Sequence, residues 1–230
     1  MSADFLVEGS MISEVQSITD LGVHFDHRLD YRLHVARTAS AAYGTLGFVR
    51  RSAREFINPL TARLLYNAMV LSKLEYCSIV WSPHEATYVS MIEKVQKAFL
   101  RFLYQKQYFH YPFLYPSKFL LGMLGYCSLE LRREMALMRL IFSVIRGQLS
   151  IPEILSRIGF YVPEKYTRGR IHSLFTVPKY RTNMSCHSPI TRAVTLLNEW
   201  NVGRPDEDIF IMSCYTFSRS MSEFLSSKFS

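Results

Sequence analysis

The sequence lacks the paired aspartates, glycine-rich loops and cysteine pairs on which many catalytic and metal-binding motifs depend. Its 230 residues contain no Asp-Asp pair and no phosphate-cradling glycine motif. The four cysteines are far apart and form no Cys-x-x-Cys pair: Cys77, Cys127, Cys186 and Cys214. This spacing indicates neither a zinc module nor a disulfide framework, and we expect no cofactor, no metal site and no small-molecule substrate. Because free cysteine is among the most buried residue types, we expect buried, reduced thiols.

Long hydrophobic runs are also missing. The two most apolar stretches, residues 64–81 and 135–145, are interrupted by Lys73, Glu75 and Arg139. Both fall short of the roughly 20 clean apolar residues that a membrane span needs. The first ten residues have no basic region and no small-residue cleavage site, so a secretory signal is not indicated. We expect a nuclear or cytoplasmic protein that is not secreted and has no membrane partner.

Acidic residues are scarce in the middle of the chain. Residues 94–192 contain 16 lysines and arginines but only 4 acids, although the net charge of the whole chain is just +8. This asymmetry favours a polyanionic partner, with nucleic acid first and an acidic membrane surface second. A solvated basic surface without a specific ligand is the alternative.

Apolar residues make up 49% of the chain, which is enough for one compact domain or two small ones. β-branched and apolar residues predict a small β hairpin within residues 5–25, built from two or three short strands. Gly22 inside this run suggests a bulge or a close backbone approach. A first helix is expected from about Tyr31, after an Asp30 cap, to the region of Gly47.

Two further helices are predicted between residues 58 and 106. Asn58-Pro59 combines a cap with a proline at the first helical position. The expected buried stripe of this helix is Leu60, Leu64, Ala68, Leu71 and Leu74, running toward a buried Trp81. Ser82-Pro83-His84-Glu85 reads as a capping box that starts the next helix. The predicted buried face of that helix is Ile92, Val95, Phe99 and Phe102.

The remaining pattern predicts more helices joined by irregular chain. A loop over residues 104–116 precedes a short helix capped by Ser117, and a longer helix begins at Ser128 and ends at Gly147. Residues 163–189 read as an extended basic connection. Terminal helices are expected over residues 189–200 and 208–229. The fold class is therefore mainly α, with a small N-terminal β hairpin and an irregular C-terminal region.

Several stretches occur together in one order. They are Phe5-Leu-Val-Glu-Gly-Ser-Met-Ile, Asp20-Leu-Gly-Val-His-Phe-Asp, Leu74-Glu-Tyr-Cys-Ser-Ile-Val-Trp-Ser-Pro, Ser128-Leu-Glu-Leu-Arg-Arg, and Ser188-Pro-Ile-Thr-Arg followed by Asn198. In this order they resemble the C-terminal part of jockey-like non-LTR retrotransposon reverse transcriptases. The resemblance covers nearly the whole chain, and none of these stretches is catalytic.

The resemblance implies a domain order and a function. Residues 1–27 would be the end of the palm, residues 28–150 a helical thumb-like bundle, and residues 151–230 a C-terminal region with a basic connection and terminal helices. The implied function is a fragment of an RNA-directed DNA polymerase whose thumb grips template and primer. It would not be an enzyme on its own, because two-metal phosphoryl transfer needs clustered carboxylates and the family's aromatic-x-Asp-Asp turn is absent.

The resemblance and the charge together point to RNA or an RNA/DNA template-primer as the partner, bound through its backbone without sequence preference. The candidate nucleic-acid-binding residues are Lys94, Lys97, Arg101, Lys106, Arg132 and Arg133. We expect Lys97 and Arg101 to be exposed.

Three features have open interpretations. Arg132-Arg133 at a helix start needs either a phosphate or a buried carboxylate, such as Glu130 or Glu134, because the helix dipole disfavours cations there. The aromatic residues either form a stacking platform for unpaired bases or fold back onto the core; they are Tyr104, Tyr108, Phe109, Tyr111, Phe113 and Tyr115. The acids at 206–208 favour helix capping over metal binding. A decayed element remnant or a captured helical interaction domain remains the rival to a functional thumb.

Overall fold

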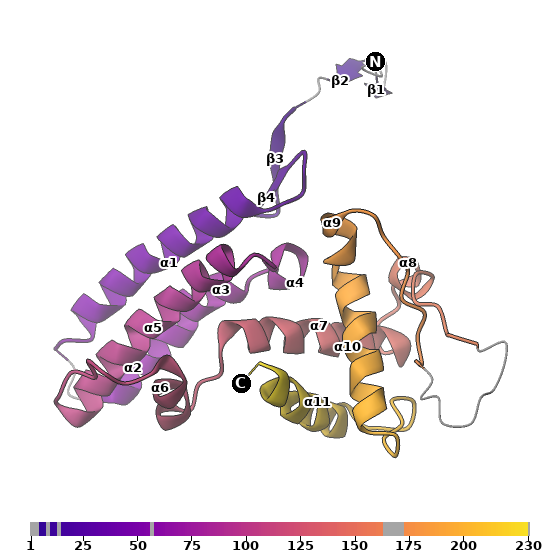
Figure 1. Ribbon diagram of the computed structural model, residues 1–230. Helices are drawn as coiled ribbons and strands as arrows, with labels where there is room; N and C mark the ends of the chain where they lie inside the picture. The colour runs from indigo at the N-terminus through magenta and orange to yellow at the C-terminus, as the bar shows by residue number, and fades with distance from the viewer. Residues whose placement is uncertain (1–4, 8–9, 13–14, 56–57, 163–172, 230) are drawn as a thin grey trace.

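The computed structural model describes residues 5–7, 10–12, 15–55, 58–162 and 173–229. It confirms a mainly helical fold with a small N-terminal β portion (Figure 1). Two antiparallel hairpins are present in place of one. Strand β1 (Phe5–Val7) pairs with β2 (Ser10–Ile12), and β3 (Ser17–Asp20) pairs with β4 (Val23–Asp26).

Gly22 lies in the turn of the second hairpin, so of its two predicted roles, a bulge or a close backbone approach, the bulge is wrong. Leu21 and Gly22 both have positive φ, at 46° and 81°, which is the backbone of a tight two-residue hairpin turn. The Tyr76 hydroxyl donates to the Leu21 carbonyl over 2.8 Å. The hairpin is thereby tied to the helical part of the chain.

The first core is built by helices α1 to α6. They are α1 (Arg32–Ser52), α2 (Pro59–Tyr66), the π-helical turn η1 (Asn67–Leu71), α3 (Ser72–Glu75), α4 (Ser78–Trp81), α5 (Ala86–Tyr108) and α6 (Ser117–Leu124). Helix α1 continues past Gly44 and Gly47, because α5 packs along its length and the cost of about 1 kcal/mol per glycine is affordable. The two helices run in the same direction: Arg32 pairs with Glu85 at their N-terminal ends, and Arg50 lies over Phe102 near their C-terminal ends.

The helix predicted to begin at Asn58-Pro59 is confirmed at its start, but the segment up to Trp81 is divided into α2, η1, α3 and α4. Asn58 caps α2 by accepting from the Leu60 amide over 2.9 Å. The predicted stripe is wrong in its first half, since Leu60, Leu64 and Ala68 are exposed. The buried positions are Ala62, Tyr66, Val70, Leu71, Leu74 and Trp81. These residues are buried because they pack against α5: the Tyr66 ring of α2 stacks on the Phe99 ring of α5, with centroids 3.7 Å apart.

The predicted capping box at Ser82 is also wrong. Helix α5 begins at Ala86, with Glu85 as its N-cap residue and no side-chain cap. The Glu85 carboxylate is engaged by Arg32 from α1 over 2.7 Å. A contact between helices has therefore displaced the local capping interaction.

The second core is built by α7 to α11: α7 (Leu129–Ile145), α8 (Pro152–Leu155), α9 (Asn183–Cys186), α10 (Pro189–Gly203) and α11 (Cys214–Lys228). Ser128 caps α7 and Gly147, at φ 66°, follows its end, as predicted. Ser188 caps α10. Helix α11 starts at Cys214, later than the expected residue 208. The two cores meet within α7, where Leu129 belongs to the first and Leu131 to the second.

Part of the predicted basic connection, residues 163–172, lies outside the described residues. The chain after it is fixed to α10 by Asn198, whose side chain accepts from the Phe175 amide and donates to the Phe175 carbonyl, both over 2.8 Å. Phe160 and Phe175 also form an isolated antiparallel bridge. Asn198, one of the residues that carries the family resemblance, therefore has a structural role here.

Candidate nucleic-acid interface

Three of the predicted binding residues share one outward face of α5. At 3.6 residues per turn, positions 94, 97 and 101 fall within roughly 60° of one another around the helix axis. Lys94 is exposed, whereas Lys97 and Arg101 are half-buried. The expectation that Lys97 and Arg101 are exposed is therefore wrong, because both side chains are half-buried. The Arg101 Nε is enclosed without a hydrogen-bond partner, because the lower part of this side chain lies against the protein.

These cations have no acidic partners in the described part of the chain. No ion pair there involves Lys94, Lys97, Arg101 or Lys106. Other cations are paired with carboxylates: Arg32, Arg132, Arg192, Arg204, Arg219 and Lys228. The one acid of α5, Glu93, accepts from the Glu130 amide over 2.9 Å, and burial raises the pKa of its carboxyl. The outward face of α5 is thus positively charged and uncompensated.

Lys106 lies on a different side of α5 from the other three. It lines a surface hollow of about 280 Å³ together with Arg50, Arg54, Phe102 and Gln105. The Arg50 guanidinium lies over the Phe102 ring, 5.5 Å from its centroid, in the geometry of a cation–π contact. Arg50 and Arg54 were not among the predicted binding residues, because both precede the basic segment 94–192. The cluster of arginines at the end of the first predicted helix could have indicated them.

Arg132 and Arg133 do not form a free phosphate-binding pair. Arg132 binds the Glu75 carboxylate with Nε and Nη2, the second contact measuring 3.1 Å. Arg133 is only 2% exposed and cannot reach a nucleic-acid backbone, so its prediction as a binding residue is wrong. Of the two open interpretations, the carboxylate one holds for Arg132, with Glu75 in place of Glu130 or Glu134.

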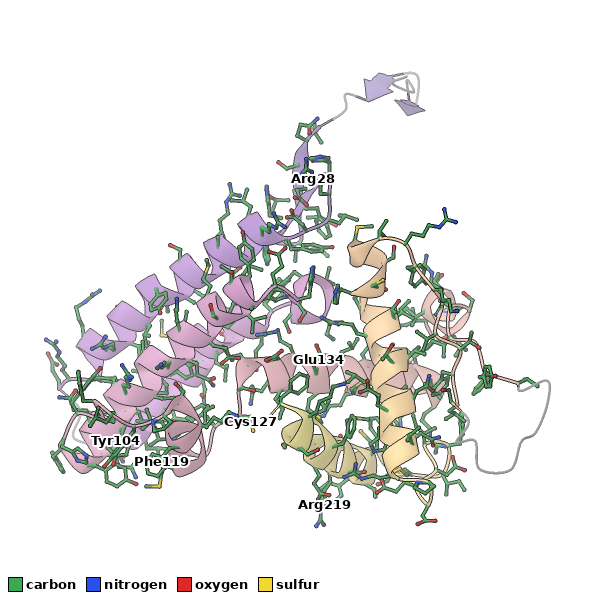
Figure 2. The ribbon with its side chains drawn as sticks, in the orientation of Figure 1. Arg28, Tyr104, Phe119, Cys127, Glu134 and Arg219 are labelled. Carbon is green, nitrogen blue, oxygen red and sulfur yellow. The ribbon has the colours of Figure 1, made fainter. Side chains whose placement is uncertain are left out.

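The buried guanidinium of Arg133 lies where α5, α7 and α10 meet. Burial lowers its pKa, and Glu93, Glu130 and Glu134 oppose that effect. None of its three nitrogens has a hydrogen-bond partner among the described protein atoms. Glu134, labelled in Figure 2, is 3.6 Å from Arg192 of α10. This charged group belongs to the packing of the helices and not to the binding surface.

The aromatic series divides between the two interpretations left open. Tyr104 is buried and contacts Tyr108 and Tyr115, with ring centroids 4.5 and 5.5 Å apart. Tyr115 in turn contacts Phe119 on α6; Tyr104 and Phe119 are labelled in Figure 2. Phe109 and Phe113 instead project into solvent, with 90% and 78% of their surface exposed. The tyrosines brace the loop against α5 and α6, while the two phenylalanines leave their rings free.

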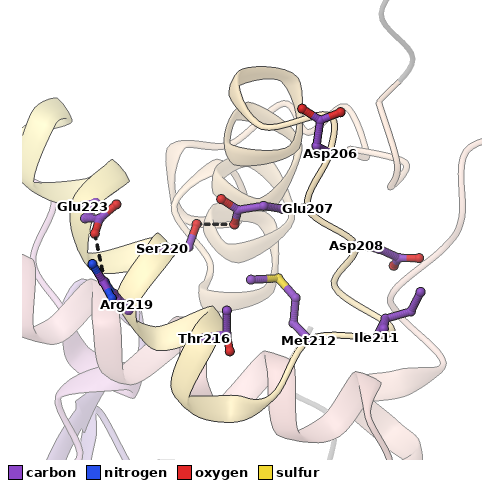
Figure 3. A pocket seen from close by; sticks show the side chains of 9 residues that line it. All are labelled: Asp206, Glu207, Asp208, Ile211, Met212, Thr216, Arg219, Ser220 and Glu223. Carbon is purple, nitrogen blue, oxygen red and sulfur yellow. Dashed lines mark hydrogen bonds and ion pairs between the residues drawn. The ribbon is translucent and has the colours of Figure 1, made fainter.

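The acids at 206–208 form neither a metal site nor a helix cap. Figure 3 shows Asp206 and Asp208 pointing away from Glu207, which accepts from the Ser220 hydroxyl. Asp208 instead accepts from the Phe210 amide over 2.8 Å, and α11 is capped by Ser213. Among the described residues, no group of three or more His, Cys, Asp or Glu side chains is arranged to hold a metal ion.

The prediction of buried thiols is wrong. All four cysteines are free and exposed. Cys77 lies at the sharp turn between α3 and α4, with a φ of 50°, and Cys127 lies between α6 and α7. Loop positions expose a side chain whatever its hydropathy, because the neighbouring helices pack elsewhere.

Family models, curated proteins and solved structures were each compared with this chain. None of them matches it. The resemblance to non-LTR reverse transcriptases therefore stays a prediction. Within the described ranges, no helix combines the length and apolar character that crossing a bilayer requires.

Proposed function

We propose that this chain binds the backbone of RNA or of an RNA/DNA template-primer through α5, as the thumb portion of a non-LTR reverse transcriptase. The observation that carries this proposal is the set of unpaired cations on α5, led by Lys94 and Lys97. Unpaired cations on a rigid helix contact phosphates without reading bases. Such binding is weak, in the micromolar range or weaker near physiological salt, and indifferent to sequence.

Salt dependence is the physical signature of this mode. If about 4 to 6 phosphates are contacted on a duplex, the slope of log K against log salt is roughly −4 to −5. The assay is a fluorescence anisotropy titration of a hairpin RNA and a primer duplex at several salt concentrations. A folded sample that shows no binding at low salt would contradict the proposal and favour a captured interaction domain or an element remnant.

The variant that tests the surface is Lys94→Gln with Lys97→Gln. Lys94 is exposed, Arg101 has an enclosed Nε that Lys97 lacks, and glutamine is a good helix former. The slope is expected to flatten by about two units, one for each lost phosphate contact. The matched control is Arg146→Gln with Lys179→Gln, which removes the same charge from two exposed positions outside α5 that form no ion pair in the described part of the chain. An equal effect of both pairs would mean that net charge alone attracts the RNA.

Arg132→Gln is a second control. Because Arg132 is already held by Glu75, its loss is expected to leave the salt slope unchanged. A loss of affinity equal to that of the Lys94 and Lys97 pair would extend the binding surface onto α7.

A further inference from the structure

The hollow at the C-terminal ends of α1 and α5 has the chemistry of a phosphate site. Arg50 reaches it from α1, Arg54 from the turn after α1 and Lys106 from α5, and Gln105 adds an amide. None of the described residues that line it is acidic. None of the three cations forms an ion pair within the part of the chain that the structure describes. The helix dipole favours a cation near the C-terminal end of each helix. It does not explain why three cations converge on one hollow.

An exposed aromatic residue follows the end of α5, three positions after Lys106. Phe102 and Lys106 are four residues apart and share one side of α5. Phe109 ends the helix with a φ of 60°, an unusual conformation for a bulky residue. Its side chain is 90% exposed, and its backbone lies about one helical turn, or roughly 5 Å, beyond that of Lys106. That separation is comparable with the one between a phosphate and the base of the same nucleotide.

We propose that this end of the molecule binds an unpaired nucleotide, with its phosphate in the hollow and its base stacked on Phe109. Cationic grooves with adjoining aromatic faces are the usual means of holding single strands without sequence preference. The inference rests on the proposed function and adds a substrate class, namely a single-stranded extension of the duplex held by Lys94 and Lys97, which reaches the hollow on another side of α5.

An anionic bilayer is the main competing occupant, since apolar side chains with cations behind them also bind lipid surfaces. Two observations favour the nucleotide. The hollow brings three cations and a polar amide together at one place, which suits a discrete phosphate. Tyr104 and His110 both contact Tyr115 edge-on, whereas Phe109 makes no ring contact in the described part of the chain.

The test compares a blunt RNA duplex with the same duplex carrying an unpaired 3′ extension, both by fluorescence anisotropy. The wild-type chain is expected to bind the extended probe roughly ten times more tightly, as one stacked base predicts. Phe109→Ala is expected to remove this preference while leaving the blunt duplex unaffected. Arg50→Gln with Arg54→Gln is expected to reduce the preference and to flatten the salt slope on the extended probe by about two units.

Two substitutions separate stacking from apolar contact. Phe109→Tyr keeps a ring and is expected to keep the preference, whereas Phe109→Leu keeps apolar surface and is expected to lose it. Tyr215→Ala on α11 is the control for loss of a similarly exposed ring. Retention of the preference in Phe109→Leu, or equal binding of the two probes by the wild type, would overturn the proposal.

Vesicles of mixed neutral and acidic phospholipid provide the remaining comparison. Cosedimentation that depends on Phe109 and Phe113 would assign this surface to lipid and overturn the nucleotide proposal. Failure of the nucleotide proposal is distinguishable from failure of backbone binding, because the effect of the Lys94 and Lys97 pair on the blunt duplex would remain.

Discussion

At the scale of single residues, neighbouring positions in one helix have opposite roles. Lys94 is exposed and unpaired, while Glu93 beside it faces α7 and accepts from a backbone amide. Arg132 is held by a carboxylate, while Arg133 is enclosed. Since successive residues of a helix point about 100° apart, the chemistry of a charged run depends on which members the neighbouring helices cover.

A residue-scale prediction concerns His34. Its Nδ1 accepts from the His24 amide over 3.2 Å, and its ring contacts Trp81 edge-on at 5.2 Å. Burial, and secondarily His24, lowers the pKa of His34 below its usual 6.5. The unfolded chain therefore takes up a proton first as the pH falls, and the folded state loses stability just below pH 6.5. Protonation also removes the acceptor at Nδ1.

The measurement is the midpoint of urea unfolding between pH 7.5 and 5.5, a range chosen to bracket the usual histidine pKa of about 6.5. We expect a lower midpoint at the acidic end and a weaker dependence in His34→Gln. His27→Gln, which alters an exposed histidine, is the control. His187, whose pKa is also lowered by burial, will leave part of the dependence in place. An unchanged profile in His34→Gln would contradict the prediction.

At the scale of helices, contacts between elements override local preferences. The Glu85 carboxylate accepts from Arg32 and does not take part in a capping box. The π-helical turn η1 lies in the helical segment whose residues Tyr66 and Val70 are buried in the core. Insertion of a π turn changes the angle between the residues before and after it. The sequence spacing of leucines therefore did not reveal the buried face.

A prediction at this scale concerns the contact between α7 and α10. Arg192 and Glu134 are both largely buried and lie 3.6 Å apart. Removing one member of such a pair leaves the charge of the other buried without its partner. Arg192→Met, which leaves the Glu134 carboxylate in this state, is therefore expected to lower the free energy of unfolding by about 3 kcal/mol near neutral pH. The double variant Arg192→Met with Glu134→Leu is expected to lose less than Arg192→Met alone.

Acid pH provides the control for this explanation. Burial raises the pKa of Glu134, so the stranded carboxyl takes up a proton more readily than in the unfolded chain. The loss in Arg192→Met is therefore expected to shrink toward pH 5, where the neutral acid is tolerated. A loss that is the same at both pH values would point to packing and not to charge.

At the scale of the whole molecule, the two cores share α7. The α5 face and the hollow both belong to the first core, whereas the acids at 206–208 lie in the second, beyond α10 (Figure 1). The unpaired cations of the α5 face and of the hollow favour approach of a polyanion to the first core.

The whole-molecule prediction is that the isolated chain does not extend a primer on any template, with magnesium or manganese. The reason is the missing Asp-Asp pair, since two-metal catalysis needs carboxylates that share the ions. Labelled nucleotide incorporation is the measurement, with boiled protein as the control. Incorporation by a preparation free of host polymerase would contradict the prediction.

Local physics made parts of this protein predictable from its sequence. Asn58, Ser128 and Ser188 cap helices and Gly147 ends one, because capping needs only residues three or four positions apart. The mainly helical fold and the concentration of cations in 94–192 follow from the sequence in the same way.

Burial and convergence were decided by the tertiary structure. The packing of α1 beside α5 brings Arg50 and Arg54 to Lys106 from about 50 positions away in the chain. The meeting of α5, α7 and α10 encloses Arg133, and all four thiols are exposed, two of them in loops and two at the ends of α9 and α11. These outcomes depend on which distant helix faces a residue, and no local pattern of spacing encodes that choice.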